Sequence, residues 1–299
     1  MNNETTHEKI SEGCTRRTAL AGMAGLSAAA GVALTHAAPA QAETAALKGR
    51  IKQSVSRWCF DKIPMDEFCV AAKAMGLVGV DLLSEADWAV VQSHGLQVAL
   101  ANGPGKIPDG FNDPKNHDTL VKGCEELFPK LVAAAVPNVV VFSGNRKGMD
   151  DKEGLKNCVK GLKRITPLAE KLGVNVVMEL LNSKRSHKDY MCDLTAWGVE
   201  LCKQVESPRF KLLYDIFHMQ IMEGDVISTL QENIAYIGHI HTGGVPGRHE
   251  IDDTQELNYR RICQAIVEAN FTGFVAHEFS PKSDQPLESL RQAVQICDV

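Results

Sequence analysis

Four apolar runs in the second half of the chain each end in a side chain that can bind a metal ion. The runs cover residues 174–179, 211–215, 237–241 and 274–278, and they end in Glu179, Asp215, His241 and Glu278. Bulky residues such as Leu212, Leu213 and Tyr214 favour a strand that is buried on both faces, as in a parallel sheet. Each interval between successive ends has room for one helix and one strand. In neighbouring parallel strands, the four side chains would all lie at the same end of the sheet.

From Arg50 onward, strand and helix patterns alternate without a linker or a change in composition. Besides the four runs, we predict strands at residues 51–60, 78–83, 96–101 and 139–142. Helices are predicted at residues 64–75, 86–94, 113–135, 153–172, 193–205, 226–236, 258–269 and 287–296. Eight strand–helix units in roughly 250 residues predict a single closed (β/α)8 barrel, in which active sites lie at the C-terminal ends of the strands. We expect this barrel domain to span residues 43–299.

A doubly wound open sheet is the alternative fold. It would need a glycine-rich phosphate-binding turn after its first strand. Residues 57–61 read Arg-Trp-Cys-Phe-Asp and contain no glycine. The sequence therefore favours the closed barrel.

The N-terminus has the layout of an export signal. Arg16 and Arg17 precede a weakly hydrophobic run at residues 21–35, and residues 40–42 read Ala-Gln-Ala. This order predicts a twin-arginine signal peptide at residues 1–42, cleaved after Ala42, and hence a periplasmic or exported protein. The run is short and weakly apolar for a membrane span of about 20 residues, so we expect no stable membrane insertion after cleavage. A disordered or helical N-terminal extension is the alternative.

The charge balance narrows the range of partners. The chain has 32 Lys+Arg against 37 Asp+Glu, a formal net charge of -5, so no basic field is available to hold a nucleic acid. Nine cysteines occur without a CxxC pair, and Cys158, Cys202 and Cys263 fall within predicted apolar helix faces. We therefore expect the cysteines to be mostly reduced and buried. The expected partner is a small-molecule substrate, and a homo-oligomer remains open.

The four side chains at the strand ends form a hard, oxygen-rich ligand set. Two glutamates, one aspartate and one histidine suit Mn2+, Mg2+ or Co2+ better than a structural zinc, which favours cysteine. Singly, each has a simpler explanation: His241 could be a core histidine, and Asp215 could cap a helix. Together they are harder to explain without a cation, because a buried unpaired carboxylate costs several kcal/mol.

Three longer stretches carry a resemblance. Residues 179–182 (ELLN), 214–225 (YDIFHMQIMEGD) and 237–250 (IGHIHTGGVPGRHE) resemble the xylose-isomerase-like barrel superfamily, and most closely the hydroxypyruvate isomerase family. The resemblance covers about residues 50–295. It implies that Glu179, Asp215, His241 and Glu278 bind a divalent metal, and that Glu179 and Glu278 also transfer the proton. Two features depart from the family pattern: some hydroxypyruvate isomerases carry glutamine where His241 stands, and residues 182–190 are unusually basic.

The implied activity is isomerisation of an α-hydroxy ketone to the aldehyde, such as hydroxypyruvate to tartronate semialdehyde, through an enediolate. Alternatives on the same scaffold are a ketose 3-epimerase and a keto-inositol dehydratase. His241 favours the epimerase, because ketose 3-epimerases carry histidine there. From another class, an exported barrel could bind a carbohydrate without turnover. Apurinic endonucleases share the scaffold, but they need more metal ligands and a basic surface.

Four further side chains are candidates for substrate binding. His218 lies three residues beyond Asp215 and could polarise a substrate oxygen. Arg248 lies in the loop after the seventh strand, where a guanidinium can bind a substrate carboxylate through two hydrogen bonds. His187 and Lys188 in the basic loop complete the set.

Overall fold

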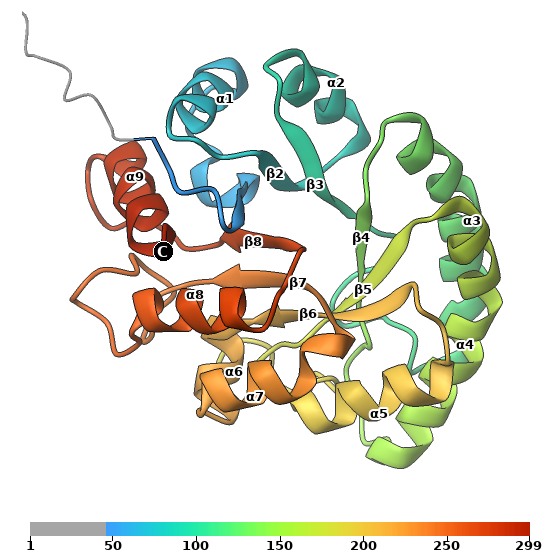
Figure 1. Ribbon diagram of the computed structural model, residues 1–299. Coiled ribbons are helices and arrows are strands. Elements are labelled where there is room, and N and C mark those ends of the chain that lie inside the picture. Colours follow the sequence, from blue (N-terminus) through green and yellow to red (C-terminus); the bar gives the residue numbers. More distant parts are fainter. Residues whose placement is uncertain (1–45) are drawn as a thin grey trace, which may run out of the picture. The chain divides into compact units, whose positions relative to one another are not determined.

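The computed structural model describes residues 46–299, which form a single closed barrel of eight parallel strands (Figure 1). Each strand pairs with its neighbours in sequence, and the first strand closes on the last. The strands are β1 (Lys52–Ser56), β2 (Gly79–Leu83), β3 (Gln97–Asn102), β4 (Asn138–Val141), β5 (Asn175–Glu179), β6 (Phe210–Asp215), β7 (Ile237–Thr242) and β8 (Phe274–His277). The predicted (β/α)8 fold is confirmed.

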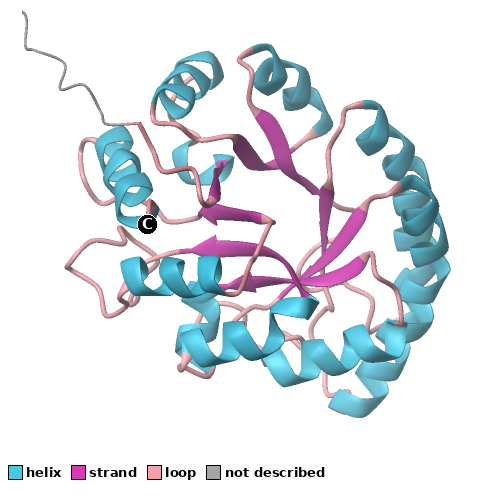
Figure 2. Cartoon of the chain, in the orientation of Figure 1, coloured by secondary structure: helices cyan, strands magenta, loops and turns pink. Residues whose placement is uncertain are grey.

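Helices surround the strands, as the colouring by secondary structure shows (Figure 2). They are α1 (Met65–Ala74), α2 (Glu85–Ser93), α3 (His117–Ala133), α4 (Asp151–Leu172), α5 (Thr195–Val205), α6 (Ile216–Met222), α7 (Val226–Asn233), α8 (Tyr259–Glu268) and α9 (Pro286–Cys297). Three short 3-10 helices are η1 (Arg57–Phe60), η2 (Pro114–Asn116) and η3 (Ile234–Tyr236). Within the described residues, no helix combines the length and apolar character needed to cross a bilayer.

The barrel separates two apolar layers. Inside, Leu100, Val140, Val177 and Leu213 pack together beneath the C-terminal end of the strands. Outside, a much larger buried cluster fills the space between the strands and the helices. All eight cysteines in the described part are free, and seven of them are buried, as the sequence predicted. The rigid wall that results fixes the positions of the side chains at the strand ends.

The first strand is shorter than predicted. β1 ends at Ser56, and residues 57–60, which we had assigned to the strand, form η1. The guanidinium of Arg57 donates hydrogen bonds to the backbone carbonyls of Phe60, Asp61 and Ile63. These bonds satisfy a tight turn that the strand pattern did not reveal, and the turn carries Trp58 to the mouth of the barrel.

The residues after the sixth strand also differ from the prediction. No helix was predicted between residues 205 and 226, but α6 begins directly after Asp215. Asp215 caps this helix, because its Oδ1 accepts a hydrogen bond from the backbone N–H of His218 at 3.1 Å. The short helix thereby fixes the imidazole of His218 beside the carboxylate of Asp215.

The predicted signal peptide at residues 1–42 lies outside the described residues. It stays a prediction.

Candidate active site

Glu179, Asp215, His241 and Glu278 meet at the C-terminal end of the barrel. β5 and β6 end at the first two, β7 carries His241, and Glu278 directly follows β8. One ligand atom from each residue lies within 4.8 Å of the others, and all four residues are buried. The structure therefore brings together the four residues that the sequence placed at one end of the sheet.

The imidazole of His241 faces the three carboxylates. Its Nδ1 atom lies 2.5 Å from Glu278 Oε2 and 3.9 Å from both Glu179 Oε1 and Asp215 Oδ2. Nδ1 is buried, and none of these contacts has the geometry of a hydrogen bond. A nitrogen lone pair aimed at converging carboxylate oxygens fits a divalent cation held by one nitrogen and three oxygen ligands. The geometry does not select one metal among Mn2+, Mg2+ and Co2+.

Arg248 is the only arginine or lysine whose ion pair reaches this cluster within the described residues. Its Nη2 atom donates to Asp215 Oδ2 at 2.5 Å and also to Glu278 Oε2. The guanidinium lies 5.0 Å from the ring centre of Phe217 and 5.8 Å from that of Trp58. One fixed positive charge thus faces three buried carboxylates, which leaves an excess of negative charge.

The two glutamates have opposite electrostatic environments. Burial and the negative charge of Glu278 raise the pKa of Glu179 to about 8, and no hydrogen bond to its carboxylate is recorded among the described residues. Burial also opposes ionisation of Glu278, but Arg248, His241 and the indole N–H of Trp58 outweigh it and lower the pKa of Glu278. Two neighbouring carboxyl groups whose pKa values are pushed apart are suited to acid and base roles.

The pKa values of the other two members of the cluster, Asp215 and His241, are also shifted. Burial, partly offset by the charge of Arg248, raises the pKa of Asp215 to about 6. For His241, burial opposes protonation, but the charge of Glu278 and the contact with Asp81 outweigh it, so the pKa is raised. A divalent cation would replace the protons that these groups otherwise hold.

His218 is held in a defined tautomer. Its Nδ1 atom lies 2.6 Å from the side-chain nitrogen of Asn182, whose oxygen already accepts the backbone N–H groups of Arg185 and Ser186. The amide orientation of Asn182 is therefore fixed, so Nδ1 accepts and the proton is on Nε2. Burial and the positive charge of Arg248 lower the pKa of His218, which keeps the ring neutral.

Nε2 of His218 lies 2.6 Å from Nη1 of Arg248. Both nitrogens carry protons in this arrangement, and neither satisfies the other. Two adjacent donors of this kind can bind one substrate oxygen or a substrate carboxylate.

A cavity of about 910 Å³ opens above the cluster. Among the residues that line it are Glu179, Glu278, His187, His218, Arg248 and Arg185. His187 packs edge-to-face against His218 with 5.2 Å between ring centres. Lys188 is exposed and does not line the cavity, whereas Arg185 from the same basic loop does.

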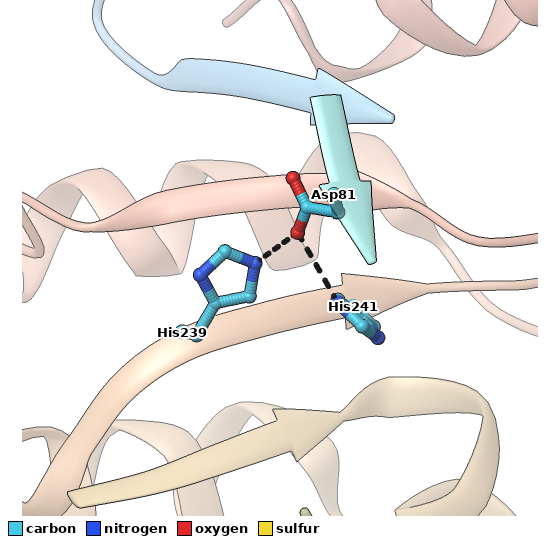
Figure 3. A group of neighbouring side chains, drawn as sticks. All are labelled: Asp81, His239 and His241. Atoms are coloured by element: carbon cyan, nitrogen blue, oxygen red, sulfur yellow. Dashed lines mark hydrogen bonds and ion pairs between the residues drawn. The ribbon is translucent and has the colours of Figure 1, made fainter. Parts of the chain in front are cut away.

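The sequence analysis did not identify three polar residues around the cluster. Trp58 donates its indole N–H to Glu278 Oε1 at 2.6 Å, but we had placed it within a strand. Asp81 of β2 and His239 of β7 form a second buried group with His241 (Figure 3). An aspartate inside an otherwise apolar strand was the signal for Asp81, because a buried carboxylate needs a partner.

The comparisons with known proteins agree with this architecture. The family model described as "Xylose isomerase-like TIM barrel" matches residues 72–297. The chain belongs to this family. Among curated relatives, the human putative hydroxypyruvate isomerase is 31% identical over 211 residues, which cover 67% of this chain and 76% of the relative.

Two other relatives match over shorter segments. The zebrafish (Danio rerio) putative hydroxypyruvate isomerase is 32% identical over 136 residues, 45% of this chain and 49% of the relative. The 2-oxo-tetronate isomerase of Cupriavidus necator is 37% identical over 111 residues, 37% of this chain and 42% of the relative. The chain thus spans about half the length of these two relatives or less.

Solved structures share the fold at low sequence identity. An AP endonuclease of family 2 from Brucella melitensis has a TM-score of 0.72 at 22% identity, covering 81% of this chain and 96% of that one. D-psicose 3-epimerase from Clostridium cellulolyticum has a TM-score of 0.67 at 18% identity, covering 83% and 97%. At these identities, the likeness shows the barrel fold alone.

Proposed function

We propose that this chain is an intramolecular oxidoreductase that interconverts a small α-hydroxy ketone and its aldehyde isomer, with hydroxypyruvate and tartronate semialdehyde as the leading pair. One observation carries the proposal: Glu179 and Glu278 both line the cavity and both belong to the group suited to a divalent metal. Relatives named putative hydroxypyruvate isomerase and 2-oxo-tetronate isomerase support the same reaction class.

In the proposed mechanism, Glu179, Asp215, His241 and Glu278 hold Mn2+ or Mg2+, with Co2+ as a further candidate. When bound, the cation supplies Lewis acidity that acidifies the substrate C–H and balances the charge of the enediolate. Glu179 and Glu278 exchange the proton with the two adjacent substrate carbons, one as base and the other as acid. The two carboxyl groups belong to different strands, so they can reach the substrate from different sides.

The donors beside the glutamates orient the substrate. The Nε2–H of His218 donates to a substrate oxygen, and the guanidinium of Arg248 binds the carboxylate that a hydroxy-keto acid carries. His187 supports the ring of His218 from the cavity side. Lys188 is a weaker candidate, because it acts only if the basic loop closes over the cavity.

Ketose 3-epimerisation is the second candidate function. It is supported by His241, because the resemblance described above implies a histidine at this position in ketose 3-epimerases. The same two glutamates would then exchange protons on opposite faces of one carbon. Dehydration of a keto-inositol uses the same acid–base pair, whereas carbohydrate binding without turnover leaves the second glutamate without a role.

Deuterium exchange in D2O with the Mg2+-loaded protein tests the proposal. We expect one deuterium to enter hydroxypyruvate at the hydroxymethyl carbon, detected by proton NMR as loss of about half of that CH2 signal and by mass spectrometry as a gain of one mass unit. Exchange at carbon 3 of a ketose instead would identify an epimerase. Absence of exchange in both substrates, with the metal shown to be bound, would contradict either reaction.

We also propose export through the twin-arginine route, supported by the sequence layout of residues 1–42. Replacing Arg16 and Arg17 by lysine should retain the protein in the cytoplasm as the uncleaved precursor. Cell fractionation and mass spectrometry of the N-terminus measure both effects. Unchanged export of the double variant would show that another route is used.

A further inference from the structure

Asp81 is a fully buried carboxylate that the proposed mechanism does not use. It lies on β2, which β1 and β8 separate from His239 and His241 of β7, and its carboxylate points toward both imidazoles (Figure 3). Its Oδ2 atom lies 2.5 Å from Nε2 of His239 and 3.4 Å from Nε2 of His241. A side chain of β2 thus crosses the barrel to reach the back of the imidazole whose other nitrogen faces Glu278.

The backbone of β2 is distorted at this residue. The pairing of β2 with β3 shifts register on both sides of Asp81, and Leu82 adopts a left-handed conformation with φ of 58°. Leu82 packs on the inner apolar cluster and lines the cavity, while Asp81 contacts the inward-facing histidines. Two successive residues therefore face the barrel interior, which a regular strand does not allow.

This distortion has a cost that the apolar packing does not explain. A leucine in the left-handed region is strained, and such strain persists in structures mainly where it serves a site. Without the bulge, either Asp81 or Leu82 would face the helices. The bulge is what brings the Asp81 carboxylate to the imidazoles.

The two nitrogens of His241 face different groups. Nδ1 is directed at Glu179, Asp215 and Glu278, and Nε2 has Asp81 as its ion-pair contact. The Nε2 contact at 3.4 Å lacks full hydrogen-bond geometry, as is common for catalytic contacts before a ligand is bound. An Nδ1 that binds a cation must carry its lone pair there, which places the ring proton on Nε2, toward Asp81.

We infer that Asp81 is a positioning residue: it holds the Nε2–H of His241, so that Nδ1 is presented to the divalent metal bound by Glu179, Asp215 and Glu278. A carboxylate behind a metal-binding histidine fixes both the tautomer and the ring orientation and strengthens the ligand. His239 fixes the Asp81 carboxylate in turn through its 2.5 Å contact. This inference rests on the proposed function, because it needs the metal site.

A second metal ion between Asp81, His239 and His241 is the competing explanation of this group. Both imidazoles direct Nε2 at the same oxygen, Asp81 Oδ2. Two N–H groups that share one acceptor produce this arrangement. The contact of His239 Nε2 with Asp81 Oδ2 also has hydrogen-bond geometry, which the contact of His241 Nδ1 with Glu278 lacks, so the hydrogen-bonded arrangement is favoured for this group.

Mn2+ affinity of the full-length protein tests the inference without using turnover. Titration followed by electron paramagnetic resonance should show about 10- to 100-fold weaker binding for Asp81→Asn, the loss typical of an outer-shell partner. In a His241→Asn background, the additional change Asp81→Asn should alter the affinity less than about twofold, because Asp81 acts through His241. An equal loss in both backgrounds, or no loss in the first, would overturn the inference.

A second measurement determines the tautomer in the unaltered protein, and a variant serves only to assign the His241 signals. With diamagnetic Mg2+ bound, nitrogen-15 NMR should show His241 with a protonated Nε2 and an unprotonated Nδ1, assigned by comparison with His241→Asn. A proton on Nδ1 would refute the positioning role. If the wild-type protein binds no metal, the proposed function fails together with the inference. If the wild-type protein isomerises its substrate and Asp81→Asn binds Mn2+ as tightly as wild type, only the inference fails.

Discussion

Arg146 and Arg248 lie in loops that follow strands of the barrel, and each pairs with two carboxylates. Arg146 follows β4 and binds Asp151 and Asp193, while Arg248 follows β7 and binds Asp215 and Glu278. The Arg146 side chain remains 22% exposed and also donates to the backbone carbonyls of Tyr190 and Met191. One of its two carboxylates, Asp151, is half exposed, so solvent compensates the second negative charge and this network needs no further partner.

The Arg248 network differs because its excess negative charge is buried. The side chains of its two carboxylates are at most 4% exposed, a third carboxylate from Glu179 lies beside them, and the facing nitrogen of His241 makes no hydrogen bond. Buried charge of one sign is unfavourable unless a counter-charge compensates it. The comparison teaches that an arginine–carboxylate pair alone does not mark a site; excess negative charge with an unused ligand atom does.

The largest expected effect is on turnover. Glu179→Gln and Glu278→Gln each keep the size of the side chain and a carbonyl ligand but remove the base. Because general acid–base catalysis typically contributes 10²- to 10⁴-fold, each variant should lose at least about 100-fold in kcat at saturating Mn2+. Steady-state kinetics measures the loss, and circular dichroism confirms the fold. A variant with near wild-type kcat would show that its glutamate serves only as a ligand.

The next largest effect is on metal affinity. Asp215→Asn removes a ligand charge, so Mn2+ binding should weaken by more than the about 10- to 100-fold that follows loss of an outer-shell partner. Because the metal binds the folded state, adding Mn2+ to chelated wild-type protein should raise Tm, and the variant should respond much less. Calorimetry measures both. Equal responses would remove Asp215 from the metal site, leaving its role as the cap of α6.

Much of the site around Arg248 could be predicted from the sequence, and the reason is geometric. Glu179, Asp215 and His241 end apolar runs, and parallel strands bring such ends together whatever the details of packing. Trp58 and Asp81 were missed because their placement depends on irregular backbone: a 3-10 turn held by Arg57 in one case and a bulge at Leu82 in the other. Periodicity reports regular strands, so it does not detect residues that irregular backbone brings into the barrel mouth.

The buried carboxylates beside Arg248 should make the stability of the protein depend on pH. The pKa of Glu179 is raised from 4.5 to about 8, so the folded state binds this proton more tightly than the unfolded chain. Stability of the chelated protein should therefore fall as pH rises from about 4.5 to about 8. Asp215 acts in the same sense between 3.8 and about 6. Glu278, with a lowered pKa, acts in the opposite sense, but only below about pH 4.5.

Glu179→Gln should remove the part of this decline that Glu179 contributes, whereas His241, whose pKa is also raised, contributes only above about pH 6.5 and remains in the variant. Thermal unfolding between about pH 5 and pH 8 measures it, with roughly 2–4 °C in Tm for each kcal/mol. The wild-type Tm should fall relative to that of the variant as pH rises. Parallel curves would show that Glu179 titrates normally in the folded protein. Saturating Mn2+ provides the control, because the metal replaces the proton and should flatten the wild-type curve.

The smallest expected effect belongs to the partly exposed network around Arg146. Asp193→Asn removes one carboxylate that accepts from Arg146 and from the hydroxyl of Ser183, and Asp193 is buried. Loss of a partly buried, charge-assisted hydrogen bond costs about 1.5–3 kcal/mol, which denaturant unfolding would detect. Mn2+ affinity should stay within about twofold of wild type, since the second carboxylate of this network, Asp151, still neutralises Arg146. If Asp193→Asn weakened Mn2+ binding as strongly as Asp215→Asn, the two arginine networks would be one coupled site, and the distinction between exposed and buried excess charge would fail.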